Sequence, residues 1–368
     1  MRSFHFGLAF ILALDVIPVR ADKVDDAVQK GVKFLVRSQN KQTGAFNSPR
    51  GNVRWAAVNS YPMTALAIMS MAAVGHQPTD PGEIGEAMKK GIEFLLRDDP
   101  RRRRSQGYYG VDGSRMYGHG ITTLCLAEML GMGVGRDQDR RLRETLEQAV
   151  NLILSAQRRP KFNPIFVGGW RYEPTSNDSD LSITVWQLMA LRSAQNAGVR
   201  VPKQNIDLAV KYLERSYQSG RNARGEPTNL KSGFGYTPNS RRPGYASTSA
   251  GLLSLQVCNR TDAPEVIGSA NWLEDFNLRP SERWFYYGTY YYSQGMQKRK
   301  DDDPNSVGSK QARLARDNVE RIMLNLQKAN GSWDGSNRNE NDVGQIYCTS
   351  LAILSLSVKY HFLPIYQD

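Results

Sequence analysis

Lys30-Gly31-Val32-Lys33-Phe34-Leu35, followed by Gln39 and then Gly44-Ala45-Phe46, opens a pattern that recurs along the whole chain. The last copy runs from Ile322 through Gln327 to Gly331-Ser332-Trp333. A fixed period of this kind marks repeat units that cannot bury their apolar faces alone. The sequence therefore predicts a fold built from six repeats. Their apolar anchors, spaced 60, 58, 60, 60 and 50 residues apart, are Phe34, Phe94, Leu152, Tyr212, Trp272 and Ile322.

Each repeat reads as two helices joined by a turn. The anchor segments carry polar residues on one face, as Asp25, Lys33 and Arg37 show in the first copy, so we expect them to form an outer layer. The segments after the turns, such as 62–69 and 349–356, are apolar on nearly all sides, which is typical of buried helices. The fold class is therefore all-α. We interpret the Gln, Gly and aromatic residues of the turns as scaffold.

The ends and loops of the chain complete this organisation. Residues 1–21 combine Arg2, an apolar run and Ala21 at a plausible cleavage point, which predicts an export signal and a periplasmic or secreted protein. Residues 22–368 are expected to form a single domain. The longer loops, at 98–118, 158–179, 219–244 and 297–310, are predicted to gather on one rim, where repeat proteins usually keep their binding residues.

Charge and cysteine content narrow the partners. The formal net charge of +12 favours an anionic membrane surface, phosphates or an acidic glycan. No nucleic-acid reader motif is present, so we predict no nucleic-acid partner. The three cysteines, Cys125, Cys258 and Cys348, fall in or beside inner helices without zinc-ligand spacing and are interpreted as small buried apolar residues.

The pattern Lys-Gly-x-x-Phe-Leu, then Gln, then Gly-x-Trp resembles the QW repeats of squalene-hopene and oxidosqualene cyclases and of protein prenyltransferase β-subunits. It is also similar to bacterial exported terpene-cyclase-like repeat proteins. This resemblance covers residues 24–362 and implies an α6/α6 toroid with a central funnel lined by the first turns of the inner helices. It also implies an isoprenoid or other hydrophobic ligand in that funnel.

Two aspartates are the candidate catalytic residues. Terpene cyclases protonate an alkene with an Asp-x-Asp-Asp motif, and the matching stretch here is Asn177-Asp178-Ser179-Asp180. Only Asp180 matches directly, and the chain has room for one barrel where cyclases have two, so full squalene cyclisation is not expected. The alternative for Asp178 and Asp180 is capping of the helix that follows, where a carboxylate accepts from free backbone N–H groups.

Prenyltransferases hold zinc with Asp, Cys and His at the starts of inner helices. His119 alone among the histidines opens such a helix, and no cysteine stands in line with it. We therefore predict no metal and no cofactor, and place His119 among the ligand-binding candidates, with a hydrogen-bonded structural role as the alternative.

Tyrosines at the inner-helix starts supply the remaining candidates. Their hydroxyls favour a polar end of the funnel. The main hypothesis is a funnel that binds, and in the enzymatic version modifies, an isoprenoid; the alternatives are a glycan-binding or polysaccharide-lyase-like toroid, or a non-catalytic scaffold. The tyrosines placed in the ligand-binding set are Tyr61, Tyr245, Tyr291, Tyr292 and Tyr347.

Overall fold

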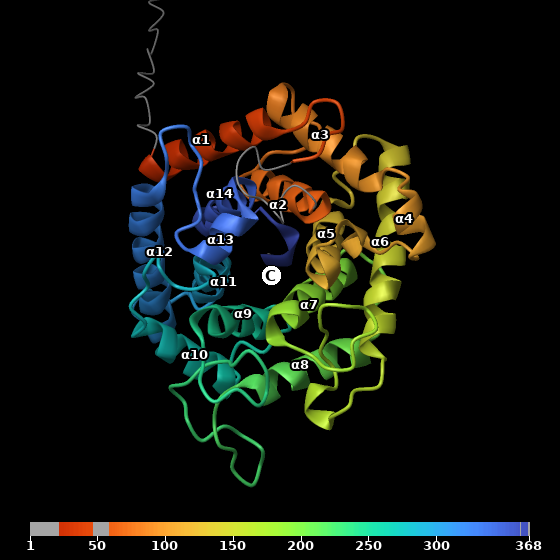
Figure 1. Ribbon diagram of the computed structural model, residues 1–368. Helices are drawn as coiled ribbons and strands as arrows, with labels where there is room; N and C mark the ends of the chain where they lie inside the picture. Colours follow the sequence, from red (N-terminus) through yellow and green to blue (C-terminus); the bar gives the residue numbers. More distant parts are fainter. Residues whose placement is uncertain (1–21, 47–58, 361, 367–368) are drawn as a thin grey trace, which may run out of the picture.

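Two concentric rings of helices form the molecule (Figure 1). The computed structural model describes residues 22–46, 59–360 and 362–366; the predicted export signal at 1–21 lies outside them. The outer helices are α1 (Lys23–Ser38), α3 (Glu83–Leu96), α6 (Arg136–Gln157), α8 (Lys203–Ser216), α10 (Pro264–Glu274) and α12 (Val307–Leu326). The inner helices are α2 (Ser60–Ala72), α5 (Arg115–Met129), α7 (Leu181–Asn196), α9 (Tyr245–Gln256), α11 (Phe285–Gln297) and α14 (Gln345–Leu356).

The predicted all-α toroid of six helix pairs is confirmed. Each anchor residue lies in an outer helix, and the inner helices alternate with the outer ones along the chain. The ring closes because α14 packs against both α1 and α2. Short helices decorate the connections: α4 (Pro100–Arg104), α13 (Arg338–Val343), and the 3₁₀ turns η1 (Tyr109–Asp112), η2 (Pro164–Phe166), η3 (Ser357–Lys359) and η4 (Pro364–Tyr366).

The glutamine at the end of an outer helix ties neighbouring repeats together. The Gln39 side-chain amide donates both to the carbonyl of Gly44 in its own turn, at 2.9 Å, and to Ala87 in the next outer helix, at 2.8 Å. Such paired bonds satisfy carbonyl groups at places where two chain segments meet. The same two-way arrangement recurs at Gln157, with Gly168 and Asn205, and at Gln327, with Gly331 and Ala27.

The turn glycine is required by a close backbone approach. Gly44, Gly168 and Gly331 adopt φ angles of 79°, 95° and 90°. A Cβ atom on any of them would lie between 2.1 and 2.4 Å from a carbonyl oxygen of the next outer helix. Only glycine combines this conformation with this contact. For Gly331 the carbonyl belongs to Lys30, so the last turn locks onto the first helix.

The turn aromatic is fixed by a hydroxyl of the inner helix. The backbone N–H of Trp333 donates to Thr349 Oγ1 at 3.1 Å, and its indole ring lies against Gly31 of the first outer helix. This contact explains the glycine of the Lys-Gly pair, because a side chain there would collide with the ring. Equivalent N–H to threonine bonds join Phe46 to Thr64, Trp170 to Thr184 and Phe234 to Thr248. The interpretation of these residues as scaffold agrees with these contacts.

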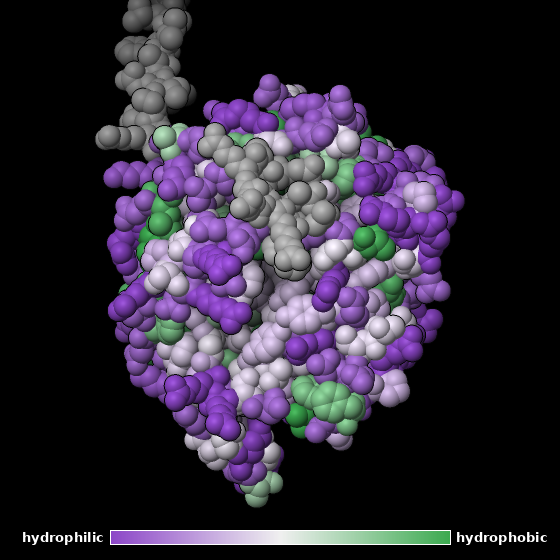
Figure 2. All heavy atoms as spheres, viewed as in Figure 1, coloured by the Kyte–Doolittle hydropathy of each residue, from purple (hydrophilic) through white to green (hydrophobic). Residues whose placement is uncertain are grey.

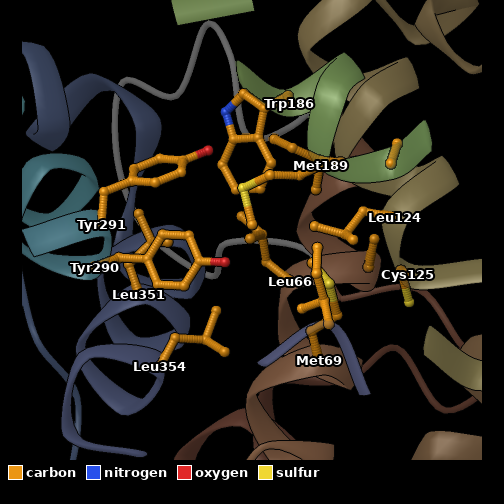
Figure 3. Packing of buried hydrophobic residues seen from close by; sticks show 14 of the residues in the cluster. Leu66, Met69, Leu124, Cys125, Trp186, Met189, Tyr290, Tyr291, Leu351 and Leu354 are labelled. Atoms are coloured by element: carbon orange, nitrogen blue, oxygen red, sulfur yellow. The ribbon is translucent and has the colours of Figure 1, made fainter. Parts of the chain in front are cut away.

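Apolar and aromatic side chains fill the middle of the ring (Figure 3). Trp186 stacks on Tyr290, with ring centroids 6.0 Å apart, and meets Tyr291 edge-on at 5.5 Å. The turn η4 enters beside them, where the Tyr366 hydroxyl bonds that of Tyr290 and the Ile365 N–H donates to Glu128 at 3.3 Å. Five inner helices contribute the labelled side chains: Leu66, Met69, Leu124, Cys125, Trp186, Met189, Tyr290, Tyr291, Leu351 and Leu354.

One loop prediction is wrong. The connections 98–118, 158–179 and 219–244 each lead from an outer to an inner helix and lie at the end of the ring where inner helices begin. The segment 297–310 leads from α11 to α12, from an inner to an outer helix. Because successive helices run in opposite directions, this segment lies at the other end.

Candidate functional site

Polar side chains gather at the end of the ring where the inner helices begin, which we call the mouth. Figure 2 shows this face hollowed near its centre and lined there by residues of intermediate hydropathy. The connections before α7 and α9, together with the first turns of α5 and α7, bring together a set of side chains that we call the mouth cluster. Its members are Tyr117, Arg171, Tyr172, Asp178, Asp180, Ser182 and Tyr236.

Asp180 is the buried centre of this cluster. It caps α7, since its Oδ1 atom accepts from the Ile183 N–H at 2.9 Å and from the Ser182 hydroxyl at 2.6 Å. Its side chain is fully buried, and its Oδ2 atom lies 3.4 Å from Arg171 Nε without the geometry of a hydrogen bond. Asp180 therefore caps the helix, as the alternative interpretation expected, and it also forms an ion pair with Arg171.

Burial raises the pKa of the Asp180 carboxyl, while Ser182, the Ile183 N–H and Arg171 act in the opposite direction. Asp178 is half-buried, and its Oδ2 atom lies 3.5 Å from Nη1 of the same arginine. One guanidinium therefore joins both predicted aspartates. The Lys161 amine bonds the backbone carbonyl of Asp178 at 2.9 Å, and burial lowers the pKa of that lysine to about 8.

Three tyrosines surround this charged pair. The Arg171 guanidinium lies over the rings of Tyr172 and Tyr236, at 5.2 and 5.6 Å from their centroids. The two tyrosine hydroxyls bond each other at 2.8 Å, and the Tyr117 hydroxyl bonds Ser182 Oγ at 2.5 Å. The arrangement presents aromatic faces and hydroxyl groups side by side, with the cation beneath them held in place by the aspartates.

His119 lies away from this cluster. It is fully buried, its Nδ1 atom accepts from the Tyr109 N–H at 3.3 Å, and its Nε2 atom donates to the Ala149 carbonyl at 3.0 Å. Burial lowers the pKa of the imidazole to about 4, consistent with a neutral ring. His119 thus does for the second repeat what Thr349 does for the last, because it accepts the N–H of the turn. Both ring nitrogens are used, which leaves none for a ligand.

The predicted ligand-binding tyrosines are dispersed. The Tyr61 hydroxyl donates to Asp99 at 2.8 Å on the way to α4, and the Tyr245 hydroxyl bonds Thr289 at 3.0 Å between α9 and α11. Tyr292 is buried with its ring 6.0 Å from that of Tyr245. The structure therefore does not bring these three side chains into the mouth cluster.

Two other predicted tyrosines lie nearer the axis. Tyr291 is fully buried in the aromatic core, and its hydroxyl has no hydrogen-bond partner among the residues that the structure describes. Tyr347 is 8% exposed, and burial raises the pKa of its hydroxyl, with Glu340 and Cys348 acting in the same direction. Both tyrosines therefore belong to the packed interior of the ring.

Sequence reasoning missed Arg171, Tyr117, Tyr172, Ser182 and Tyr236 as site residues. A signal for Arg171 was present, since it follows the turn aromatic Trp170 directly and precedes the two candidate aspartates by a few residues. Tyr172 directly follows Arg171, whereas Tyr117 comes from the first turn of α5 and Tyr236 from the α8–α9 connection, so these two join the cluster only once the ring has formed.

Within residues 22–46, 59–360 and 362–366, no group of three or more His, Cys, Asp or Glu side chains is placed to hold a metal ion. In the same residues, no helix has the length and apolar character needed to cross a bilayer.

Comparison with known proteins shows the fold. No family model matches the sequence, and no curated protein matches it. Among solved structures, the GH76A α-1,6-mannanase of Salegentibacter sp. HEL1_6 is similar, with a TM-score of 0.63 and 10% identity over 93% of this chain and 100% of that one. An inactive variant of that enzyme, with two adjacent aspartates replaced by alanine, is in complex with α-1,6-mannotetrose. It gives a TM-score of 0.62 at 10% identity, over 92% of this chain and 99% of that one.

These matches correct the family assignment. The similar structures are glycoside hydrolases, so the resemblance to squalene cyclases and prenyltransferases suggested by the repeats is wrong. The physical reason is that Gln, Gly and an aromatic residue serve ring closure, as Gln327, Gly331 and Trp333 show. They carry no information on the ligand. The hydrophobic ligand expected from that resemblance has no support either, because side chains fill the axis where it would lie.

Proposed function

We propose that this protein binds a glycan at the mouth of the toroid. The observation that carries the proposal is the mouth cluster, where Tyr172 and Tyr236 flank Arg171 and join their hydroxyls. Tyrosine offers a large amphipathic face at low entropic cost, which suits the mixed apolar and hydroxyl surface of a sugar ring. The toroids of similar structure include one bound to a mannan oligosaccharide, which supports a glycan as the ligand class.

The aspartates are positioning residues in this proposal. Asp178 and Asp180 hold the Arg171 guanidinium from two sides, at 3.5 and 3.4 Å. A guanidinium fixed in this way keeps further N–H donors for sugar hydroxyls. Export, proposed from residues 1–21, would place the protein where extracellular polysaccharides are found.

Oligosaccharide titration by calorimetry tests the proposal. We expect α-1,6-mannotetraose or another oligosaccharide from a glycan panel to bind, and Tyr236→Ala to weaken that binding about tenfold, a change of ~1.4 kcal/mol. Tyr236 is 39% exposed, so the variant should remain folded. Tyr360→Ala, at a tyrosine beside α1, is the matched control and should bind normally. Absence of binding across the panel would overturn the proposal.

Cleavage of the bound glycan is a second candidate. It is favoured by one observation: among the described residues, the Oδ2 atom of the buried Asp180 carboxyl has no hydrogen-bond partner, and burial raises the pKa of that carboxyl, which is the direction that a general acid requires. Asp180→Asn keeps the cap and removes the acid. Loss of oligosaccharide products with binding retained would support catalysis. Intact oligosaccharide after prolonged incubation with the unmodified protein would limit the function to binding.

A further inference from the structure

A second cavity opens on the same face as the mouth cluster. Its walls come from the end of α8 and from the connections 158–179 and 217–244, which also carry Tyr172 and Tyr236, and its volume is about 640 Å³. Figure 2 shows a notch at the corresponding edge of the face, between the protruding α8–α9 connection and the lobe of the α6–α7 connection. A space of this size is typical of ligand sites. We call it the arginine pocket, and its polar lining is Arg215, Gln218, Arg221, Asn239, Ser240 and Arg241.

The charged side chains that line the arginine pocket are all positive. No lining residue carries a carboxylate. Arg221 is neutralised by Glu265 at 2.9 Å, whereas Arg215 and Arg241 have no ion-pair partner in the part of the chain that the structure describes. Of three guanidiniums, one is paired, which leaves two positive charges. Arginine groups of this kind match carboxylate and sulfate groups in geometry as well as charge.

The arginine groups are held in place. The Arg215 guanidinium donates to the carbonyls of Ile165, at 3.3 Å, and of Val167. Arg221 also donates to the Gly225 carbonyl at 2.8 Å. A fixed guanidinium loses little freedom when it binds an anion. Arg241, by contrast, is exposed and free of side-chain partners among the described residues, so it can move onto a ligand.

A short hydrogen-bonded turn connects the pocket to the mouth cluster. The Thr237 N–H donates to Ser240 Oγ at 3.0 Å, and the Thr237 hydroxyl donates to Asn239 Oδ1 at 2.6 Å. Tyr236 immediately precedes this turn, so the aromatic wall of the mouth cluster and the polar wall of the pocket belong to one hydrogen-bonded loop. A chain ligand lying on Tyr236 would reach the pocket next.

We propose that the arginine pocket is an anionic subsite, which binds a carboxylate or sulfate group on a sugar of the same glycan that lies in the mouth. This rests on the proposed function and narrows its ligand from glycans in general to acidic glycans. Three guanidinium groups and the amides of Gln218 and Asn239 supply the donors.

Calorimetry with matched oligosaccharides tests the subsite. Tetragalacturonate carries carboxylates, a carrageenan tetrasaccharide carries sulfates, and α-1,6-mannotetraose is neutral. We expect one acidic ligand to bind about tenfold more tightly than the neutral one at low salt, with the gap shrinking at roughly 0.5 M NaCl. The tighter of the two acidic ligands identifies the group that the pocket takes.

Two arginine variants distinguish binding in the pocket from a general attraction of acidic ligands to the positively charged protein. Arg241→Gln should weaken the acidic ligand about fivefold and leave the neutral one unchanged. Arg242→Gln removes the same charge from the neighbouring exposed residue, which does not line the pocket, and should leave both unchanged. Equal effects of the two variants, or acidic ligands no tighter than neutral ones, would overturn the subsite. Neutral binding that still depends on Tyr236 would then leave the proposed function standing, whereas no binding of any ligand would remove both.

Discussion

The turns between the helices and the mouth of the ring differ in whether their contacts recur from repeat to repeat. At the turns, the same contacts recur: Gln157 bridges Gly168 and Asn205 as Gln327 bridges Gly331 and Ala27. At the mouth, no second repeat copies the pairing of Arg171 with Asp178 and Asp180 in the described part of the chain. Repeated contacts therefore build the ring, whereas contacts found in a single repeat mark the candidate site. The two kinds of position should therefore respond differently to mutation.

The largest effect is expected at the turn that closes the ring. Gly331→Ala combines a φ of 90° with a Cβ atom 2.4 Å from the Lys30 carbonyl oxygen. We expect a loss of about 4 kcal/mol in the free energy of unfolding, from backbone strain and overpacking together. Chemical denaturation measures it.

Gly198→Ala is the control for that prediction. Gly198 has a φ of 77°, but no atom of the described residues outside its own chain neighbours lies within 4 Å of a Cβ atom placed on it. It should cost only about 1 kcal/mol, the strain of the left-handed conformation alone. Equal losses in the two variants would contradict the assigned role of the carbonyl contact.

The next effect concerns a buried acid on the axis, outside the repeat pattern. Burial raises the pKa of Glu128 to about 7, from an ordinary value near 4.5, while Ser193 and the Ile365 N–H oppose the shift. The folded state therefore holds its proton more tightly than the unfolded state. The stability that this proton supports is full below about pH 4 and is lost as the pH rises towards about 7. The shift corresponds to roughly 3 kcal/mol.

Glu128→Gln should remove this pH dependence. Relative to the unmodified protein, the variant should gain stability between about pH 5 and about pH 8, as followed by denaturant unfolding at each pH. Glu340, whose pKa burial also raises to about 7, stays in the variant and retains a similar slope of its own. Glu144→Gln, on the exposed face of α6, should change nothing. Parallel pH profiles for Glu128→Gln and the unmodified protein would show that Glu128 titrates normally.

A smaller effect is expected from the threonine that holds a turn aromatic. Thr349→Val removes the acceptor of the Trp333 N–H, and Trp333 is fully buried. An unsatisfied buried N–H costs about 2 kcal/mol. Thermal unfolding should show the loss, whereas glycan affinity should stay unchanged because Thr349 is a buried residue of α14 outside the mouth cluster. Thr349→Ser keeps the hydroxyl and should recover most of the stability.

The repeats made the fold predictable. A turn glycine, a bridging glutamine and a buried aromatic residue meet physical needs that the chain encounters in each copy, so their spacing reveals the ring without knowledge of distant contacts. The same property explains the wrong family assignment, because toroids with different ligands have the same ring to close. The position of His119 within its repeat was also informative. It corresponds to Thr64 and Thr349 near the start of an inner helix, which indicates a residue that accepts the N–H of the turn.

The site was predicted only in part because its contacts cross between repeats. Asp178 and Asp180 stand close to Arg171 in sequence and were found from the helix start that they precede. Tyr236 meets Tyr172 from 64 residues away, and Tyr117 meets Ser182 from 65 residues away. Such distances are set by the curvature of the ring and by loop conformations that follow no period.

The smallest effect is expected at a single tyrosine hydroxyl of the mouth cluster. Tyr172→Phe keeps the ring beside Arg171 and removes the 2.8 Å bond to the Tyr236 hydroxyl. Both hydroxyls are partly open to solvent, so unfolding should change little, within about 0.5 kcal/mol. Glycan affinity should fall about fivefold, equivalent to ~1 kcal/mol, because the freed Tyr236 ring must be ordered when the sugar binds. Calorimetry measures the affinity, with Tyr360→Phe beside α1 as the control. A loss of stability as large as that of Thr349→Val, with glycan affinity unchanged, would contradict this prediction. It would show that Tyr172 stabilises the ring and does not contribute to the glycan site.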